Sequence, residues 1–355
     1  MTSINLGKKI IDNDNLYFIA DIGANHNGSL DKALELIHKV KESGGDAAKF
    51  QNFSADKIVS NYGFDKMANK LSHQSNWKKS VYEVYKEASI DKDWTSILKK
   101  ECESIGIDYF TSPYDFASVD LVDRHVDMYK LGSGDITWLE IVDHILSKKK
   151  PLLIATGASS LEDVIRVMNY ALTKTKELVL MQCNTNYTGS VNNFKYINLN
   201  VLRSYASLYP EVMLGLSDHT PGHSTVLGGI ALGARVIEKH FTDDNNQEGP
   251  DHNFAMNPAS WSEMVERSYE LLNALGDGKK LVEKNELDSI YVQRRAICAS
   301  RSLVQGHVID RNDLVMLRPF FDGAYHPYQI DMLIGKRLHS NVAKGKAFLK
   351  EESND

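Results

Sequence analysis

The sequence has 355 residues, a formal net charge of −6 at neutral pH, 42% hydrophobic residues and 25% charged residues. This composition is typical of a globular protein with a substantial core. The acidic balance argues against nucleic acid as the main partner, because a phosphate backbone is bound by a basic face. It is compatible with a small anionic substrate, which needs only a few cations in one cleft.

The first residues, MTSINLGKKIIDNDN, lack the apolar core of a signal peptide, and no apolar run approaches the length that spans a bilayer. We therefore expect no membrane partner. The three cysteines, Cys102, Cys183 and Cys298, are widely spaced, so they indicate neither a disulfide framework nor a CxxC metal pair. Both observations favour a cytoplasmic protein.

Short apolar runs alternate with helical patterns such as SLDKALELIHKVKESGG and SSLEDVIRVMNYAL. Ser159 and Glu162 indicate a capping box, and Asn257 with Pro258 indicates the start of a later helix. The predicted strands are 16–21, 46–51, 107–112, 127–132, 151–156, 178–184, 212–217 and 235–240.

Eight strands alternating with helices predict a (β/α)₈ TIM barrel, to which we assign residues 1–278. An open doubly wound sheet is disfavoured, because the first strand–helix turn, DIGANHNG, lacks the GxGxxG spacing. The segment from Phe53 to Trp94 is longer than an ordinary connection. We expect it either to pack over the top of the barrel near the substrate or to join a subunit interface.

The pattern changes after Leu275. The polar stretch GDGKKLVEKNELDS indicates a linker, which we assign to residues 279–292. Residues 293–355 carry short β-like runs with turn residues, so they predict a small, separate β-rich domain.

Polar side chains collect at the ends of the predicted strands, where barrel enzymes build their active sites. Side chains alternate along a strand, so residues two apart share a face. The pairs that share a face are Lys49 with Gln51, Ser217 with His219, and Glu238 with His240.

His219 and His240 come from neighbouring strands and would lie side by side at the barrel mouth. Two neutral imidazoles in a polar cleft suit a divalent transition metal, with carboxylate or water completing the coordination. Alternatively, each histidine is hydrogen-bonded to a neighbouring loop and has only a structural role. The spacing alone does not separate these two interpretations.

Lys49 and Lys130 lie near strand ends and would form a phosphate and carboxylate site if they converged with Ser112, Ser133 and Ser217. Alternatively, each lysine extends to solvent.

Other polar residues have an ordinary structural interpretation. Asp251 would by default be a solvated loop residue, and Tyr187 could bind a polyol or pack its loop. No partner is identifiable for His26, His223 or His252, for which surface or structural roles are expected.

At these strand ends the sequence resembles the sialic acid synthase (N-acetylneuraminate synthase) family, along essentially the whole chain. The tail SLVQGHVIDRNDLVMLRPF…IGKRL resembles the antifreeze-like (SAF) domain of those enzymes. The matching segments in the barrel are ADIGANHNGSLDKA, AAKFQNF, YFTSPYD, YKLGSGDI, LLIATGAS, GLSDHT, LGARVIEKHFT and GPDHNFAMNP.

The resemblance implies a domain-swapped homodimer that condenses phosphoenolpyruvate with open-chain N-acetylmannosamine or a related acetamido sugar and releases phosphate. It implies a divalent metal, Mn²⁺ or else Mg²⁺ or Co²⁺, on His219 and His240. The implied phosphoenolpyruvate contacts are Lys130, Ser133, Ser217, Ser112 and Thr185. The implied sugar contacts are Lys49, Gln51, Tyr187, Asp251 and, from the small domain across the dimer, Arg318.

Four positions depart from the family pattern. Asp21 and Asp135 stand where glutamate is common, and with Lys49 and Lys130 they are the expected catalytic residues. Thr185 and Ala155 replace an asparagine and a serine. Shorter carboxylates could make room for a different substituent, as in the diacetamido-trideoxy sugars used for legionaminic or pseudaminic acid.

Three other functions fit the sequence less well. A synthase for a phosphorylated sugar, such as a 3-deoxy-octulosonate phosphate synthase, generally lacks an antifreeze-like domain. A metal-dependent barrel hydrolase usually needs more ligands, and the DIGANHN segment offers only His26. A carbohydrate- or ice-binding protein is disfavoured, because the small domain carries Arg311, Arg318, Lys336 and Arg337 rather than a weakly polar flat face.

Overall fold

The computed structural model describes residues 3–67, 74 and 77–353. The chain divides into two compact units, Met1–Gly276 and Asp277–Asp355. This division lies close to the predicted domain boundary at residue 278, and each unit is described by itself below.

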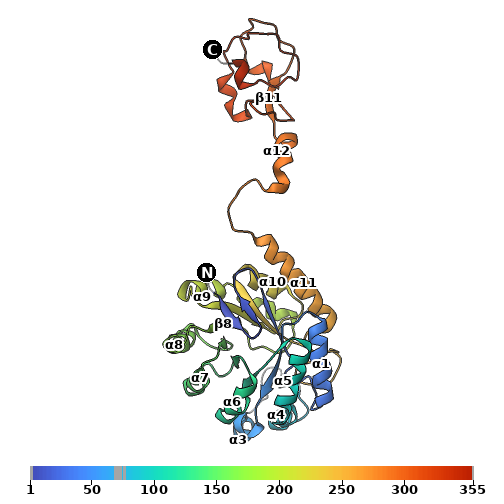
Figure 1. Ribbon diagram of the computed structural model, residues 1–355, viewed down its shortest axis with the longest axis vertical. Coiled ribbons are helices and arrows are strands. Elements are labelled where there is room, and N and C mark those ends of the chain that lie inside the picture. The colour runs from blue at the N-terminus through green and yellow to red at the C-terminus, as the bar shows by residue number, and fades with distance from the viewer. Residues whose placement is uncertain (1–2, 68–73, 75–76, 354–355) are drawn as a thin grey trace. The chain divides into compact units, whose positions relative to one another are not determined.

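The first unit is a closed barrel of parallel strands, with its helices ranged around them (Figure 1). This arrangement confirms the predicted TIM barrel. Every strand lies within two residues of its predicted bounds. In barrel order the strands are β10 (Ala234–His240), β3 (Tyr17–Asp21), β4 (Ala47–Asn52), β5 (Asp108–Pro113), β6 (Tyr129–Leu131), β7 (Leu152–Ala155), β8 (Leu178–Cys183) and β9 (Met213–Asp218).

Helices follow the strands, and the described part of the longer connection between β4 and β5 carries three short ones before α5. The helices are α1 (Leu30–Glu42), α2 (Ala55–Ile58), α3 (Asn61–Lys66), α4 (Val81–Ala88), α5 (Trp94–Ile105), α6 (Phe116–Val122), α7 (Leu139–Leu146), α8 (Leu161–Leu172), α9 (Val201–Leu208), α10 (Ser224–Ala231) and α11 (Pro258–Leu275).

Helix starts follow local capping chemistry. Asn257 caps α11 and Pro258 is its first residue, as predicted. The predicted capping box of Ser159 with Glu162 is wrong by one residue. Ser160 and Asp163 cap α8 instead, because the Ser159 amide is used in a turn to the Gly157 carbonyl.

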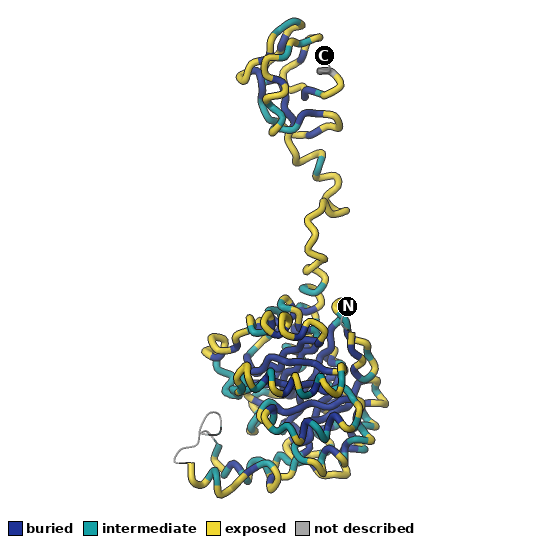
Figure 2. Tube along the Cα trace, turned by 90° about the vertical axis from the view of Figure 1, so that its left-hand side faces the viewer, coloured by how far each residue is buried: buried dark blue, intermediate teal, exposed yellow. Residues whose placement is uncertain are grey.

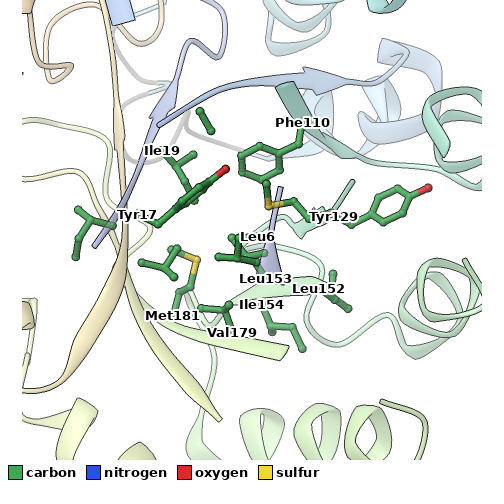
Figure 3. Packing of buried hydrophobic residues seen from close by; sticks show 14 of the residues in the cluster. Leu6, Tyr17, Ile19, Phe110, Tyr129, Leu152, Leu153, Ile154, Val179 and Met181 are labelled. Carbon is green, nitrogen blue, oxygen red and sulfur yellow. The ribbon is translucent and has the colours of Figure 1, made fainter. Parts of the chain in front are cut away.

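The strands supply most of the core. Buried positions concentrate along them (Figure 2), and side chains such as Ile19, Phe110, Leu153 and Met181 belong to one large cluster (Figure 3). Removing these side chains from water is the main stabilising contribution.

A hairpin of β1 (Ile4–Leu6) and β2 (Lys9–Ile11) closes the amino end of the barrel. Leu6 joins the strand cluster (Figure 3). The Lys8 amide donates to Asp108 Oδ2 at 3.1 Å, and Lys8 Nζ donates to the Ile107 carbonyl at 3.0 Å. Because Asp108 begins β5 and Ile107 directly precedes it, the hairpin sits at the end opposite the strand termini that carry the polar residues.

The β4–α5 connection packs over the carboxyl end of the barrel. Its residues Phe53, Ile58 and Val84 line the cavity there. This bears out the first of the two placements expected for the segment between Phe53 and Trp94, of which 68–73 and 75–76 lie outside the described residues.

The second unit is small and contains one antiparallel pair, β11 (Ala296–Ala299) with β12 (Leu314–Leu317). Isolated bridges such as Leu303 with Val342 tie its loops together. All but the last residue of helix α12 (Leu287–Gln293) falls in the segment predicted as a linker, so that segment is partly helical. Among the described residues of the whole chain, no helix is both long and apolar enough to span a membrane.

We expect Leu153→Ala to lower the free energy of unfolding of the barrel unit by about 2–5 kcal/mol, because it leaves a cavity in a fully buried cluster. Leu208→Ala, at a position 45% exposed in α9, is the matched control, with an expected change of about 0.5 kcal/mol or less. Urea unfolding followed by circular dichroism measures both. Equal changes would contradict the assignment of Leu153 to the core.

Candidate active site

A cavity of about 140 Å³ lies at the carboxyl ends of the strands. Its floor is polar and comes from the barrel, whereas one wall comes from the β4–α5 connection. Eleven predicted site residues and Glu238 line it. These lining residues are Asp21, Lys49, Gln51, Ser112, Lys130, Ser133, Tyr187, Ser217, His219, Glu238, His240 and Asp251.

Strand register brings the floor residues together. Asp21 at the end of β3 pairs with Lys49 on one side and with His240 on the other. Ser217 of β9 pairs with Glu238 of β10. Alternation of side chains then places these groups on the inner face, which explains why residues two apart in sequence share the cavity.

The intervening residues of β9 and β10 point to the other face. Asp218 and Lys239 form a buried ion pair there. Thr225 of α10 donates to Asp218 Oδ2 at 2.7 Å, and Lys239 Nζ donates to the Thr220 carbonyl at 2.6 Å. This network anchors the strand ends that carry His219 and His240.

A buried cluster of two lysines and two carboxylates occupies the floor. Lys49 Nζ lies 2.5 Å from Asp21 Oδ2 and 3.8 Å from Glu238 Oε2. Lys130 Nζ lies 3.2 Å from Glu238 Oε1, which also accepts a hydrogen bond from Ser217 Oγ at 2.9 Å. Each cation therefore has a carboxylate partner, as buried charges require.

The charges of this cluster support one another. Burial alone would raise the pKa of Asp21, but the Lys49 ammonium and His240 bring it below its usual value. Burial likewise opposes ionisation of Glu238, whose pKa is lowered by Lys130 and Lys49. Burial would lower the pKa of Lys49, yet Asp21 and Glu238 raise it. The two carboxylates and Lys49 are therefore ionised at neutral pH.

The two histidine rings lie side by side, with centroids 5.4 Å apart. His219 Nδ1 donates to the Asn184 carbonyl at 2.9 Å, which leaves Nε2 with its lone pair. Burial, together with the charge of His240, lowers the pKa of His219 to about 3, so this ring is neutral. A neutral imidazole with a fixed tautomer is the form that binds metals.

The surroundings of His240 also suit a metal ligand. Its Nδ1 atom is buried and makes no hydrogen bond to any described residue, and it lies 3.6 Å from Asp251 Oδ2. Its Nε2 lies 3.6 Å from Asp21 Oδ2. Within the described part of the chain, no group of three or more His, Cys, Asp or Glu side chains is arranged to hold a metal by itself. The pair fits a metal that completes its coordination with substrate or water.

Other buried polar atoms on the floor also lack hydrogen-bond partners among the described residues. Ser112 Oγ and Glu238 Oε2 make no hydrogen bond to any residue that the structure describes. Buried polar groups are normally paired, so such atoms indicate the place of a polar ligand.

Three predicted site residues are not among those that line the cavity. Thr185 lies near the lining residue Ser133, since a Cβ on Gly157 would come within 2.7 Å of both Ser133 Cβ and Thr185 Oγ1. Asp135 lies beside Gly132, and burial raises its pKa to about 6 despite the opposing charge of Lys130. Arg318 belongs to the second unit, where its Nε donates to the Gln293 carbonyl at 2.7 Å. Its role at the site stays a prediction.

Glu238 and Phe254 lie at the site but were not assigned to it from the sequence. Glu238 shares a face with His240, and this spacing was visible in the sequence. Phe254 packs against His240 with ring centroids 4.9 Å apart, and Tyr187 packs against His219 at 4.2 Å. No sequence signal identified Phe254, which follows an irregular loop.

Two of the other histidines have structural roles. His252 is buried between Thr242 Oγ1 at 2.7 Å and Asn27 Oδ1 at 3.1 Å. His26 Nδ1 accepts from the Gly28 amide at 3.1 Å.

The chain matches known proteins along most of its length. The NeuB family model matches residues 36–280. The chain is 35% identical over 344 residues to the N,N'-diacetyllegionaminic acid synthase of Legionella pneumophila, covering 94% of each. It is 30% identical over 339 residues to a pseudaminic acid synthase of Campylobacter jejuni, covering 95% of this chain and 96% of the relative.

A solved structure shares the fold. The N-acetylneuraminic acid (sialic acid) synthetase of Leptospira borgpetersenii superposes with a TM-score of 0.72 at 24% identity, covering 81% of this chain and 95% of that one. With its family model matched over most of the barrel and its relatives matched along nearly their whole length, the chain belongs to the NeuB family.

Proposed function

We propose that the protein condenses phosphoenolpyruvate with an open-chain acetamido sugar to form a nonulosonic acid, releasing phosphate. The observation that carries this proposal is one cavity in which Lys49 and Lys130 lie beside the imidazole rings of His219 and His240. The relatives named above favour a 2,4-diacetamido-2,4,6-trideoxyhexose as acceptor over N-acetylmannosamine.

Phosphoenolpyruvate would be held at the Lys130 side of the floor. Its carboxylate and phosphate need cations and hydroxyl donors, which Lys130, Ser217 and Ser112 offer. Ser133 and Thr185 are the further groups expected there. Lys130 Nζ is already paired with Glu238 Oε1 at 3.2 Å, so the bound anion would share this lysine with Glu238. Charge-assisted bonds in a dry cavity are strong.

His219 and His240 would hold a divalent cation, Mn²⁺ or else Mg²⁺ or Co²⁺. When bound, such an ion supplies Lewis acidity that polarises the aldehyde oxygen of the sugar. Asp251 and Asp21 lie close to His240 and would orient the sugar hydroxyls, together with Lys49, Gln51 and Tyr187.

The reaction then forms one carbon–carbon bond. C3 of phosphoenolpyruvate attacks the aldehyde carbon, and the aldehyde oxygen gains a proton. Water adds to C2 and loses a proton to a nearby base, for which Asp135 is the proposed group. Cleavage of the C2–O bond releases phosphate and leaves the ketone. The charged groups of the floor are already oriented before the reaction, so they lower the activation barrier of the condensation without having to reorganise.

The second unit is proposed to be an antifreeze-like (SAF) domain. In a domain-swapped homodimer it would bring Arg318 of one protomer to the acyl group of the sugar in its partner. Arg318 is suited to this role, since a guanidinium donates several hydrogen bonds in a fixed plane.

Phosphate release from phosphoenolpyruvate with Mn²⁺ tests the function. We expect release with 2,4-diacetamido-2,4,6-trideoxymannose, slower release with N-acetylmannosamine, loss on chelation and recovery when Mn²⁺ is returned. Phosphate release in the absence of metal would contradict the proposal. A failure to release phosphate with either sugar would also contradict it. A clear preference for N-acetylmannosamine would overturn the choice of acceptor.

Lys130→Met should lower kcat/KM for phosphoenolpyruvate by roughly 100-fold or more, because it removes a buried cation and leaves Glu238 without its partner. Lys176→Met, at an exposed lysine, is the matched control and should leave kcat/KM unchanged. Steady-state kinetics with thermal melts of both variants provide the measurement. A variant that keeps its activity would exclude Lys130 from the site.

The pKa of Asp135, raised to about 6, predicts a pH dependence. The carboxyl carries a proton below that pH and is ionised above it, so kcat/KM should fall as the pH decreases through about 6. Asp135→Asn should be less active and should lack this acidic limb. An unchanged limb in the variant would show that another group titrates.

A further inference from the structure

One side of the cavity differs in chemistry from the floor. We name it the apolar wall and define it by Phe53, Ile58, Trp77, Val84 and Ala88, all in the β4–α5 connection. These side chains are half-buried, so they face the cavity and do not form part of the closed core.

Helix α4 presents its part of the wall through helical spacing. Val84 and Ala88 are one turn apart and lie on the same face. The charged residues Glu83, Lys86 and Glu87 are exposed on the other side. A capping box between Ser80 and Glu83 sets where the helix begins.

Aromatic packing holds the wall in place. The rings of Phe53 and Tyr85 have centroids 5.5 Å apart, and those of Phe53 and Tyr114 lie 5.9 Å apart. The Trp77 and Tyr85 centroids are separated by 6.4 Å. Tyr114 follows the end of β5, so the wall is braced against the barrel itself.

The wall has little to offer a polar substituent. Phe53, Ile58, Val84 and Ala88 carry no hydrogen-bonding group on their side chains, whereas Trp77 has one N–H group and the adjacent Tyr85 has one hydroxyl. Of the described residues lining the cavity, the lysines and arginines are Lys49 and Lys130, and both lie on the floor against carboxylates. A phosphate at the wall would lose water without meeting a cation, and a hydroxyl placed against Val84 and Ala88 would gain no partner from them.

We infer that the apolar wall determines specificity by receiving methyl groups of the acceptor: the C6 methyl of a 6-deoxy sugar and an N-acetyl methyl. This inference rests on the proposed function and adds which part of the site selects the sugar. The wall excludes 6-phosphorylated acceptors and disfavours 6-hydroxylated ones. An apolar pocket discriminates by about 10- to 200-fold for one such group.

The test compares 2,4-diacetamido-2,4,6-trideoxymannose, N-acetylmannosamine and N-acetylmannosamine 6-phosphate. The Val84→Thr/Ala88→Ser double variant places hydroxyls on the wall with little change in volume. The single variants Val84→Thr and Ala88→Ser serve if the double variant melts early. Ala117→Ser, the same change at an exposed position in α6, is the matched control.

We expect the wild type to prefer the 6-deoxy sugar over N-acetylmannosamine by about 10-fold or more in kcat/KM and not to use the phosphorylated sugar. The double variant should reduce that ratio about five-fold or more, with KM for phosphoenolpyruvate unchanged. An unchanged ratio, an equal change in Ala117→Ser, or efficient use of the phosphorylated sugar would overturn the inference.

A second measurement distinguishes failure of the proposed reaction from failure of the proposed role of the apolar wall. If the wild type releases no phosphate with any sugar, the affinities of the same three sugars are measured by calorimetry. A preference for the 6-deoxy sugar that the double variant reduces would support the wall. Equal affinities would refute it.

Discussion

The site depends on mutual neutralisation among four buried charges. Lys49, Lys130, Asp21 and Glu238 lie where water is largely excluded, and none of them could remain charged there alone. Their pairing allows cations to persist at the barrel mouth before any ligand arrives. An anionic substrate then meets donors that are already oriented, and the carboxylates keep those donors from repelling one another.

Alternation along β9 and β10 serves both sides of the strands. Ser217 and Glu238 face inward, whereas Asp218 and Lys239 face α10 and form a second buried ion pair. The same short segments therefore carry the reactive groups and their own support. A shift of the Asp218–Lys239 pair would therefore also move Ser217 and Glu238, because each is joined to its neighbour by one peptide unit.

Much of the barrel could be predicted because its strands are short apolar runs and its helices are amphipathic. The polar floor followed from strand parity, which placed Ser217 with His219. The same parity placed Glu238 with His240, but its role could not be assigned, because the lysine partners that make it part of the charge cluster are seen only in the structure. The apolar wall could not be predicted, because the orientation of α4 depends on packing of Phe53 and Tyr85 across a long connection. The start of α8 was missed by one residue, where two adjacent serines offered equivalent caps.

The hairpin closes the amino end of the barrel, whereas the candidate active site lies at the carboxyl end. Its contacts with Ile107 and Asp108 lie a full strand length away from the residues that line the cavity. Substitutions at the mouth can therefore accumulate without loosening the sealed end. A lineage built on this architecture is free to explore new acceptors while its thermal tolerance is maintained elsewhere.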